Sequence, residues 1–143
     1  MKKILDKWRL FVTENKKSIS SLMQAVDFIK KNPDLDIFLD KPKGSFKKFG
    51  GQEKITMPFD YGEWPALINP ADGMGWDLII VPSAKDNHDE LVPVGAVRYT
   101  KESGKYGNDK IIVAPQSEYT PEDKKLLDEF FFPLEQFRAI EWF

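Results

Sequence analysis

Hydrophobic positions recur along this chain with two periods, a helical one before residue 33 and a shorter one after it. In residues 4–15, Ile4, Trp8 and Phe11 fall at helical spacing, and charged residues occupy the opposite side. Apolar side chains at i, i+4 and i+7 form one face of an amphipathic helix. The pattern therefore predicts a first helix that packs against the rest of the chain.

A second helix is predicted directly after the first. Ser18 is a residue type that caps helix N-termini, and Asn32 and Pro33 end the apolar pattern. The apolar residues between these limits are Leu22, Met23, Val26 and Ile29. The two helices predict a hairpin over residues 1–33, packed on a single domain formed by residues 34–143. Docking of a partner on this hairpin is the alternative.

After residue 33 the apolar runs become short and are separated by Gly, Pro, Asn and Asp, which is typical of strands and turns. Trp76–Val81 is nearly all apolar, as expected of a strand buried on both faces. Closely spaced strands in a short chain predict a small barrel or a strongly curved sheet. The predicted strands are Asp36–Leu39, Ile55–Phe59, Trp76–Val81, Val92–Tyr99 and Lys110–Ala114.

The last predicted element is a helix that begins after Thr120. A capping threonine, a proline at the first helical position and acidic residues in the first turn form its start. Pro133 ends it, and its apolar face consists of Leu126, Leu127, Phe130 and Phe131. Strands followed by a separate helix predict the α+β fold class, and the chain carries no repeat or linker that would indicate a second domain.

Composition narrows the chemistry. The 143 residues are 41% hydrophobic and 31% charged, which is ordinary for a globular domain. A net charge of −2 gives no electrostatic reason to expect nucleic acid or an anionic membrane as a partner. Without cysteine and with one histidine, His88, the chain cannot form thiolate or His-rich metal sites. Any metal would be a hard cation bound by oxygen, and His88 is predicted to be a solvated loop residue.

The chain gives no sign of membrane insertion or export. No apolar run approaches the roughly 20 residues of a membrane-spanning helix. The first 17 residues contain lysines but no continuous apolar stretch of the kind found in signal peptides. We therefore expect a cytoplasmic protein.

Charged residues at strand edges are the candidates for chemistry. Asp40, Asp72 and Asp77 adjoin strand-like runs, and so do Lys48 and Lys110. Converging carboxylates bind Mg²⁺, and lysines bind multiply charged oxyanions, so together they would suit phosphate chemistry. Acidic residues beside glycine are also ordinary turn formers, and spacing alone favours that interpretation for residues 71–81.

Several short segments of the chain occur in the same order as the conserved segments of one protein family. They read DKPKGSFKKF at 40–49, MPFDYG at 57–62, DGMGWDLIIV at 72–81, PVGAVR at 93–98, NDKIIVAP at 108–115 and FF at 130–131. In this order they resemble the conserved segments of the soluble family I inorganic pyrophosphatases. The resemblance runs from about residue 38 to residue 137 and leaves out the N-terminal helices.

The resemblance implies a small OB-like five-stranded β-barrel with flanking helices. It also implies hydrolysis of pyrophosphate by a water that Mg²⁺ activates, so that no histidine or serine nucleophile is needed. The expected cofactor is two or more Mg²⁺ ions, with Mn²⁺ as a substitute. The expected partner is pyrophosphate or a related small phosphoanhydride, and a homo-oligomer is left open.

Metal ligands are implied among the acidic residues. Asp72 and Asp77 match two metal-binding aspartates of the family, and Asp40 falls at a metal-site glutamate. Glu102 and Asp109 each stand one residue from a further aspartate position. The resemblance therefore implies a carboxylate cluster drawn from these residues.

Phosphate-binding and catalytic roles are implied for several basic residues and one tyrosine. Lys48 and Lys110 match phosphate-binding lysines, and Tyr61 matches a phosphate-contacting tyrosine. Lys54 and Arg138 are the nearest equivalents of two further cationic positions. The catalytic set implied in this way is Tyr61, Asp72, Asp77 and Lys110.

The chain departs from the family at several acidic positions. Met74 stands at the middle aspartate of the turn, and a thioether neither accepts a proton nor binds Mg²⁺ well. Gly50, Lys101 and Asn108 stand at other acidic positions, so fewer cations are expected. Glu63 shares a strand face with Tyr61 by the two-residue period and is the best candidate to supply a replacement carboxylate.

Two functions are therefore predicted, and one more is disfavoured. The first is Mg²⁺-dependent hydrolysis of a phosphoanhydride, supported by the retained aspartates and lysines. The second is a binding or assembly module that keeps the anion pocket without turnover, supported by Met74. Use of the barrel to bind oligonucleotides is disfavoured by the negative net charge.

Overall fold

The computed structural model describes residues 16–49, 52–99, 108–134 and 137–143, without the side chains of residues 47–49 and 52–54. The predicted helix over residues 4–15 lies outside the described residues. No helix in these ranges is long and apolar enough to cross a membrane.

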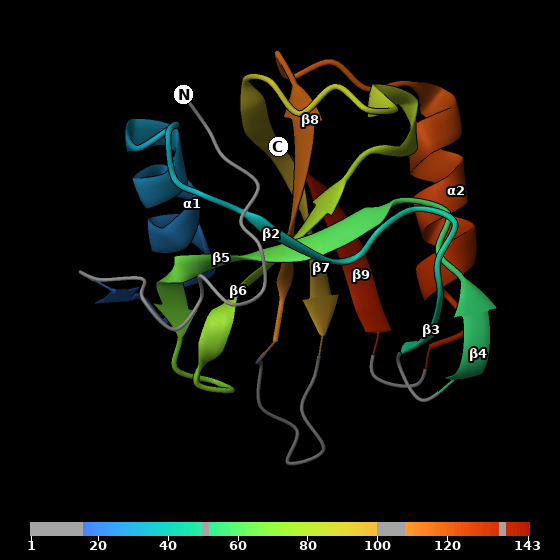
Figure 1. Ribbon diagram of the computed structural model, residues 1–143, viewed down its shortest axis with the longest axis horizontal. Helices are drawn as coiled ribbons and strands as arrows, with labels where there is room; N and C mark the ends of the chain where they lie inside the picture. Colours follow the sequence, from blue (N-terminus) through green and yellow to red (C-terminus); the bar gives the residue numbers. More distant parts are fainter. Residues whose placement is uncertain (1–15, 50–51, 100–107, 135–136) are drawn as a thin grey trace.

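A mixed seven-stranded sheet forms the centre of the molecule (Figure 1). Its main path runs through β1 (Lys17–Ser18), β5 (Asp60–Asn69), β6 (Met74–Ile80), β8 (Lys110–Pro115), β7 (Leu91–Tyr99) and β9 (Phe137–Trp142), and β2 (Phe38–Lys41) also pairs with β5. The strands β6 and β8 are parallel, whereas β6 is antiparallel to β5 and β8 is antiparallel to β7. A separate hairpin consists of β3 (Phe46–Phe49) and β4 (Gln52–Thr56).

Helices cover both faces of this sheet because alternate residues of its central strands point to opposite sides. Leu78 and Ile111 belong to the core beneath α1, whereas their neighbours Ile79 and Ile112 belong to the core beneath α2. Figure 1 shows the two helices on opposite sides of the sheet. The prediction that residues 76–81 form a strand buried on both faces is confirmed.

The helix α1 (Leu22–Lys31) begins later than predicted. Its N-cap is Ser21, whose side chain accepts a hydrogen bond from the Gln24 N–H at 3.4 Å. The prediction that Ser18 caps this helix is wrong, because Ser18 lies in β1 and pairs with Ile68 of β5. A short parallel pairing therefore takes up the residues just before the helix.

The helix α2 (Pro121–Phe131) begins as predicted. The Thr120 hydroxyl accepts from the Asp123 N–H at 3.1 Å, and the Asp123 carboxylate accepts from the Thr120 N–H at 2.8 Å. This capping box satisfies backbone donors that the first helical turn leaves free. The predicted helix start is confirmed.

Four strands were not predicted, namely β1, β3, β5 and β9, and one was placed too late. The strand β5 contains Gly62 and Pro65, which interrupt a strand pattern. The run predicted over Ile55–Phe59 is a strand only up to residue 56. Beyond it, the Met57 N–H donates to the Ser45 carbonyl and Pro58 has no N–H to donate.

The five-stranded barrel is not confirmed. The sheet has seven strands, and within the described ranges β9 pairs only with β7, while β1 and β2 pair only with β5. The two edges are therefore not joined to each other in this part of the chain. The fold is α+β, with an open mixed sheet between two helices.

Candidate functional site

A buried ion pair joins the starts of the two parallel strands at the centre of the sheet. Asp77 of β6 lies opposite Lys110 of β8 in the strand register. The Lys110 ammonium donates to Asp77 Oδ2 at 3.0 Å, and the two side chains are 5% and 18% exposed. Burial makes an unpaired ammonium costly, and the ion pair with Asp77 offsets that cost.

Two tyrosine rings flank the Lys110 ammonium. Its Nζ lies 5.2 Å from the ring centroid of Tyr61 and 5.0 Å from that of Tyr99. The Tyr61 side chain hydrogen-bonds Asp77, and burial, followed by the charge of Asp77, raises the pKa of both tyrosines. Both phenols therefore stay protonated, and Tyr61 donates to Asp77. The buried Tyr99 hydroxyl has no hydrogen-bond partner among the described residues.

Asp72 is both a turn former and a member of the charged cluster. Its Oδ1 accepts from the Met74 N–H at 2.9 Å, which closes the turn before β6. Gly73 adopts a positive φ of 75° in this turn, a conformation that glycine takes without steric cost. The other carboxylate oxygen, Oδ2, faces Asn108. The interpretation of Asp72 as a turn former and its interpretation as a metal ligand are therefore compatible.

The side-chain amide of Asn108 links Asp72 and Asp77. One of its two terminal atoms lies 3.1 Å from Asp72 Oδ2 and 3.0 Å from Asp77 Oδ2, and the amide nitrogen placed there donates to both. Asn108 itself has a positive φ of 61°, which asparagine tolerates better than most residues. This backbone conformation presents the amide between the two carboxylates.

Carboxylate and amide oxygens, the ligand types of this cluster, are those that a hard cation prefers. Adjacent ligands in an octahedral Mg²⁺ shell lie about 3 Å apart, because each is about 2.1 Å from the ion. The Asn108 amide atom has this spacing to both carboxylates, and with its oxygen turned inward the cluster would offer three oxygens. No group of three or more Asp, Glu or His side chains within the described ranges could hold a metal ion. Asp72 and Asp77 with the amide are thus the best available ligands.

Glu63 lies next to this cluster. It is opposite Asp77 in the register of β5 and β6, and its Oε2 accepts from the Gly75 N–H at 2.9 Å. Burial, followed by the charge of Asp77, raises the pKa of Glu63. A side chain at position 75 would collide with Glu63 Oε2 and the Trp64 carbonyl. The close contact between the Glu63 carboxylate and the backbone of residue 75 therefore requires glycine.

Asp40 and Lys41 extend the cluster to the edge strand β2. Lys41 lies opposite Tyr61, and its Nζ is 5.0 Å from the centroid of the Tyr61 ring. The same ammonium pairs with Asp40 at 2.8 Å. Asp40 is 52% exposed and contributes to the electrostatic field at Tyr61 and Glu63. The structure thus brings Asp40, Tyr61, Glu63, Asp72, Asp77 and Lys110 into one region.

Asp109 is not brought together with these ligands. Its carboxylate pairs with Arg98 Nε at 3.0 Å and accepts from the Tyr99 N–H at 2.8 Å. Burial raises the pKa of Asp109, and the Tyr99 N–H and Arg98 oppose that rise. The expectation that Asp109 binds metal therefore has no support from its contacts, which hold the ends of β7 and β8 together.

The remaining predicted residues are not placed at this cluster. Lys48 and Lys54 belong to β3 and β4, and their side chains lie outside the described part of the structure. Glu102 also lies outside the described residues. Arg138 is exposed on β9, in the last strand of the sheet.

Three residues of the cluster gave little signal in the sequence. Asn108 appeared only as a departure from a family pattern, and Tyr99 appeared only as the end of an apolar strand. Lys41 was not among the candidate residues. Their position depends on strand pairings between residues 13 to 33 positions apart, and local pattern does not report such pairings.

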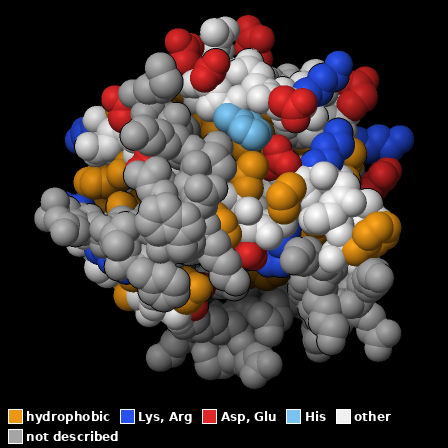
Figure 2. Space-filling view, viewed as in Figure 1, with side chains coloured by type: hydrophobic (Ala, Val, Ile, Leu, Met, Phe, Trp, Pro, Cys, Tyr) orange, Lys and Arg blue, Asp and Glu red, His pale blue; other side chains and the backbone are white. Residues whose placement is uncertain are grey.

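His88 lies in a loop as predicted, but its side chain is only partly exposed. Its Nε2 lies 3.1 Å from Asp60 Oδ2, and Asp60 Oδ1 accepts from the Lys43 N–H at 2.7 Å. Figure 2 shows the only histidine on the surface among acidic and apolar side chains. The contact ties two loops to the start of β5.

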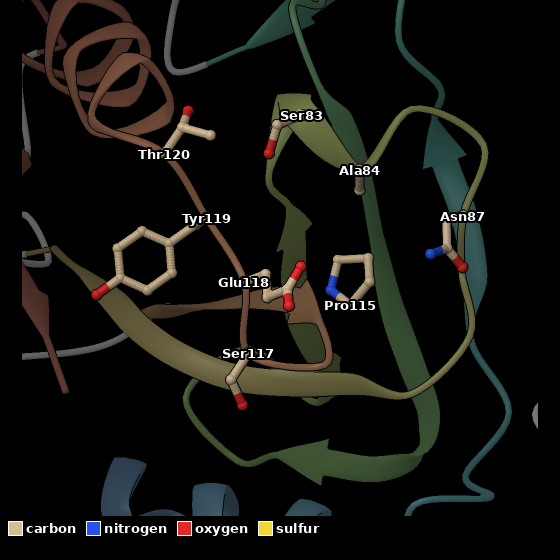
Figure 3. A pocket seen from close by; sticks show the side chains of 8 residues that line it. All are labelled: Ser83, Ala84, Asn87, Pro115, Ser117, Glu118, Tyr119 and Thr120. Atoms are coloured by element: carbon tan, nitrogen blue, oxygen red, sulfur yellow. The ribbon is translucent and has the colours of Figure 1, made fainter.

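An open pocket of about 570 Å³ lies at the other end of β6 and β8 (Figure 3). It is lined by the connections that follow these strands, including Ser83, Glu118 and Thr120. None of the predicted site residues lines it. Ser83 and Thr120 are bonded to Asp123, so part of its wall serves the start of α2.

Comparison with known proteins gives a distant similarity of chain path. The inorganic pyrophosphatase of Helicobacter pylori is 14% identical, over 71% of this chain and 78% of that chain, with a TM-score of 0.41. An inorganic pyrophosphatase of Neisseria gonorrhoeae is 13% identical, over 73% and 78%, with a TM-score of 0.45. No protein-family model and no curated protein matches the chain. At this distance no residue role or activity passes from those proteins to this one.

Proposed function

We propose that this chain binds Mg²⁺ and a small phosphoanhydride, preferentially pyrophosphate, and hydrolyses it. The main support for this proposal is the position of Asp77 Oδ2, which lies 3.0 Å from the Lys110 ammonium and 3.0 Å from the Asn108 amide. The same amide also lies 3.1 Å from Asp72 Oδ2. A cation site and a phosphate-binding ammonium therefore adjoin the same carboxylate. Hydrolysis of a phosphoanhydride needs both.

Lys110 and Tyr61 would hold the phosphate oxygens. The Lys110 ammonium is a point charge at a fixed position, because Asp77 and two tyrosine rings surround it. Tyr61 stays protonated, so its hydroxyl can donate to an anion. Asp72, Asp77 and Asn108 would hold the cation, which when bound lowers the pKa of a water molecule and neutralises phosphate charge.

Glu63 is the proposed proton acceptor. Met74 cannot take this role, since its thioether is no base and its side chain is 57% exposed. Glu63 lies opposite Asp77, and its raised pKa makes it a better base than an ordinary carboxylate. Glu63→Gln should abolish most phosphate release and leave pyrophosphate binding within a factor of about two. Unchanged release by this variant would remove Glu63 from the proposal.

A binding module without turnover is the second candidate. It is favoured by the small number of acidic ligands, since among the described residues only Asp72 and Asp77 adjoin the Asn108 amide. Met74 in place of an acidic residue favours it as well. Such a module would bind pyrophosphate and Mg²⁺ through the same residues and release no phosphate.

Phosphate release and calorimetry on the same preparations distinguish the two candidates. We expect the wild type to release phosphate from pyrophosphate with Mg²⁺, and Asp77→Asn to release none. Asp86→Asn, an exposed acidic residue in a loop, is the matched control and should behave as wild type. Binding without release would support the module, and no binding of either ligand would refute both candidates.

A further inference from the structure

We infer that Lys41 is a second phosphate-binding residue, which acts with Lys110 beside the Tyr61 ring and selects diphosphates over monophosphates. This inference rests on the proposed function and deepens it. It concerns a residue on the edge strand β2, which is far in sequence from Lys110 on the central strand β8.

A β-bulge aims Lys41 at the site. Leu39 pairs with Gly62 and Lys41 pairs with Tyr61, so Asp40 is an extra residue in the ladder between them. A bulge of this kind redirects the side chains beside it. The result is that the Lys41 ammonium lies 5.0 Å from the centroid of the Tyr61 ring.

Gly62 fixes the distance between the two strands at this point. A side chain at position 62 would collide with the Phe38 carbonyl, so only glycine permits β2 to lie this close to β5. Lys41 is therefore held against Tyr61 by the backbone as well as by its own contacts. The two lysines approach the same ring from β2 and β8, at 5.0 Å and 5.2 Å from its centroid.

The two ammonium groups differ in how firmly they are held. The side chain of Lys110 is 5% exposed and its partner Asp77 is 18% exposed, whereas the values for Lys41 and its partner Asp40 are 21% and 52%. An ion pair open to water contributes little and exchanges readily. Lys110 is therefore a fixed anchor, and Lys41 can leave Asp40 for an oxygen of the ligand.

This difference gives a selection rule. The two ammonium groups lie at most about 10 Å apart, a separation at which an anion between them lowers their mutual repulsion. A monophosphate on Lys110 has no second phosphoryl group to present to Lys41. A diphosphate bound to Lys110 has a second phosphoryl group that can contact Lys41. Removal of Lys41 should therefore weaken pyrophosphate binding more than orthophosphate binding.

Calorimetric titration with pyrophosphate and with orthophosphate, both with Mg²⁺, tests the inference. Lys41→Met should weaken pyrophosphate binding about tenfold and change orthophosphate binding less than about twofold. Lys41→Arg should restore most of the lost affinity. Lys43→Met removes an exposed lysine from the neighbouring turn and should change neither constant. If the chain turns over pyrophosphate, Lys41→Met should raise KM more than it lowers kcat.

The outcomes separate the two proposals. If the wild type binds pyrophosphate and Lys41→Met binds it equally well, Lys41 has no role and the proposed function stands. If both anions lose the same affinity, Lys41 supplies general charge and the selection rule is wrong. If the wild type binds neither anion, the proposed function fails and this inference fails with it. Thermal unfolding of each variant shows whether lost binding comes from lost folding, and Lys41→Gln provides a second truncation.

Discussion

Two carboxylates at opposite ends of the parallel strands β6 and β8 show how the same chemical group is used for different purposes. Asp123, 2% exposed, accepts from the Ser83 N–H and hydroxyl and from the Thr120 N–H, at 2.5 to 2.9 Å. Within the described ranges Asp77 is bonded by side chains, with Lys110 and Tyr61 as partners and the Asn108 amide 3.0 Å away. One carboxylate is held mainly by backbone donors, and the other by side-chain donors.

The difference indicates where a ligand can enter. Backbone donors cannot turn away, so Asp123 has no capacity for a ligand and its role is to fix the start of α2 against the loop after β6. The Tyr61 hydroxyl and the Asn108 amide can rotate toward an incoming anion or cation while Lys110 stays in place, which leaves Asp77 available. A carboxylate held by side chains is therefore a better candidate for function than one held by the backbone, even when the second is more deeply buried.

The largest effect is expected from Asp123→Ala. It removes the acceptor from buried donors on Ser83 and Thr120, and should lower the free energy of unfolding by about 3 kcal/mol. Urea denaturation measures this change. Glu122→Ala, one residue earlier and exposed, is the control and should change stability by less than about 1 kcal/mol. A loss as small as the control's would show that Asp123 is no structural anchor.

Asp77→Asn should affect both stability and binding. It leaves Lys110 buried without its counter-charge, which should lower the free energy of unfolding by about 3 kcal/mol, and we expect Mg²⁺ affinity to fall at least about tenfold. Titration calorimetry and urea denaturation measure the two quantities. If Asp77→Asn binds Mg²⁺ as well as the wild type and loses more stability than Asp123→Ala, then Asp77 is the structural anchor and the assigned roles are wrong.

Asn108→Asp should strengthen cation binding. A third carboxylate beside Asp72 and Asp77 adds ligand charge, so Mg²⁺ affinity should rise about tenfold. Without Mg²⁺ the same change places like charges together and should lower stability by about 1 kcal/mol. Thermal unfolding with and without Mg²⁺ reports both effects. If Mg²⁺ stabilises the variant no more than the wild type, the cluster does not bind a cation.

Glu63→Gln should have the smallest effect on stability, and its sign depends on pH. Burial and Asp77 raise the pKa of Glu63, so the folded state holds this proton more tightly than the unfolded chain does. That stabilisation is complete below the ordinary value of 4.5 and is lost as the pH rises through the raised pKa. The variant should therefore become more stable than the wild type as the pH rises toward neutrality. Urea denaturation as a function of pH measures the difference, and a pH-independent difference would contradict it.

The sequence predicted those elements whose signals are local. The capping residues of α2 and the continuous apolar runs of β6, β7 and β8 are short-range patterns, and each forms the element expected. By contrast, β5 is interrupted by Gly62 and Pro65, and it is a strand because β2 and β6 pair along its two edges. Tertiary pairing overrode local propensity there, as it did at Ser18.

The site could be predicted only in part for the same reason. Asp72, Asp77 and Lys110 were expected to converge, and their contacts agree with that expectation. The additional partners Asn108, Tyr99 and Lys41 follow from register, from a bulge and from one positive φ value. Asp109 was taken for a ligand because its position along the chain is adjacent to Asn108. One residue of displacement reverses the direction of a side chain, and Asp109 faces Arg98 instead.

The strand β8 is buried at every one of its residues, from Lys110 to Pro115. Strands in such positions open to solvent only when the whole domain unfolds, so their amide protons exchange most slowly. Lys110 therefore belongs to the most persistent part of the molecule, whereas Lys41 belongs to an edge that can open by itself. Of the two cationic groups that face Tyr61, one keeps its place for as long as the fold lasts, and the other is exposed to local fluctuation.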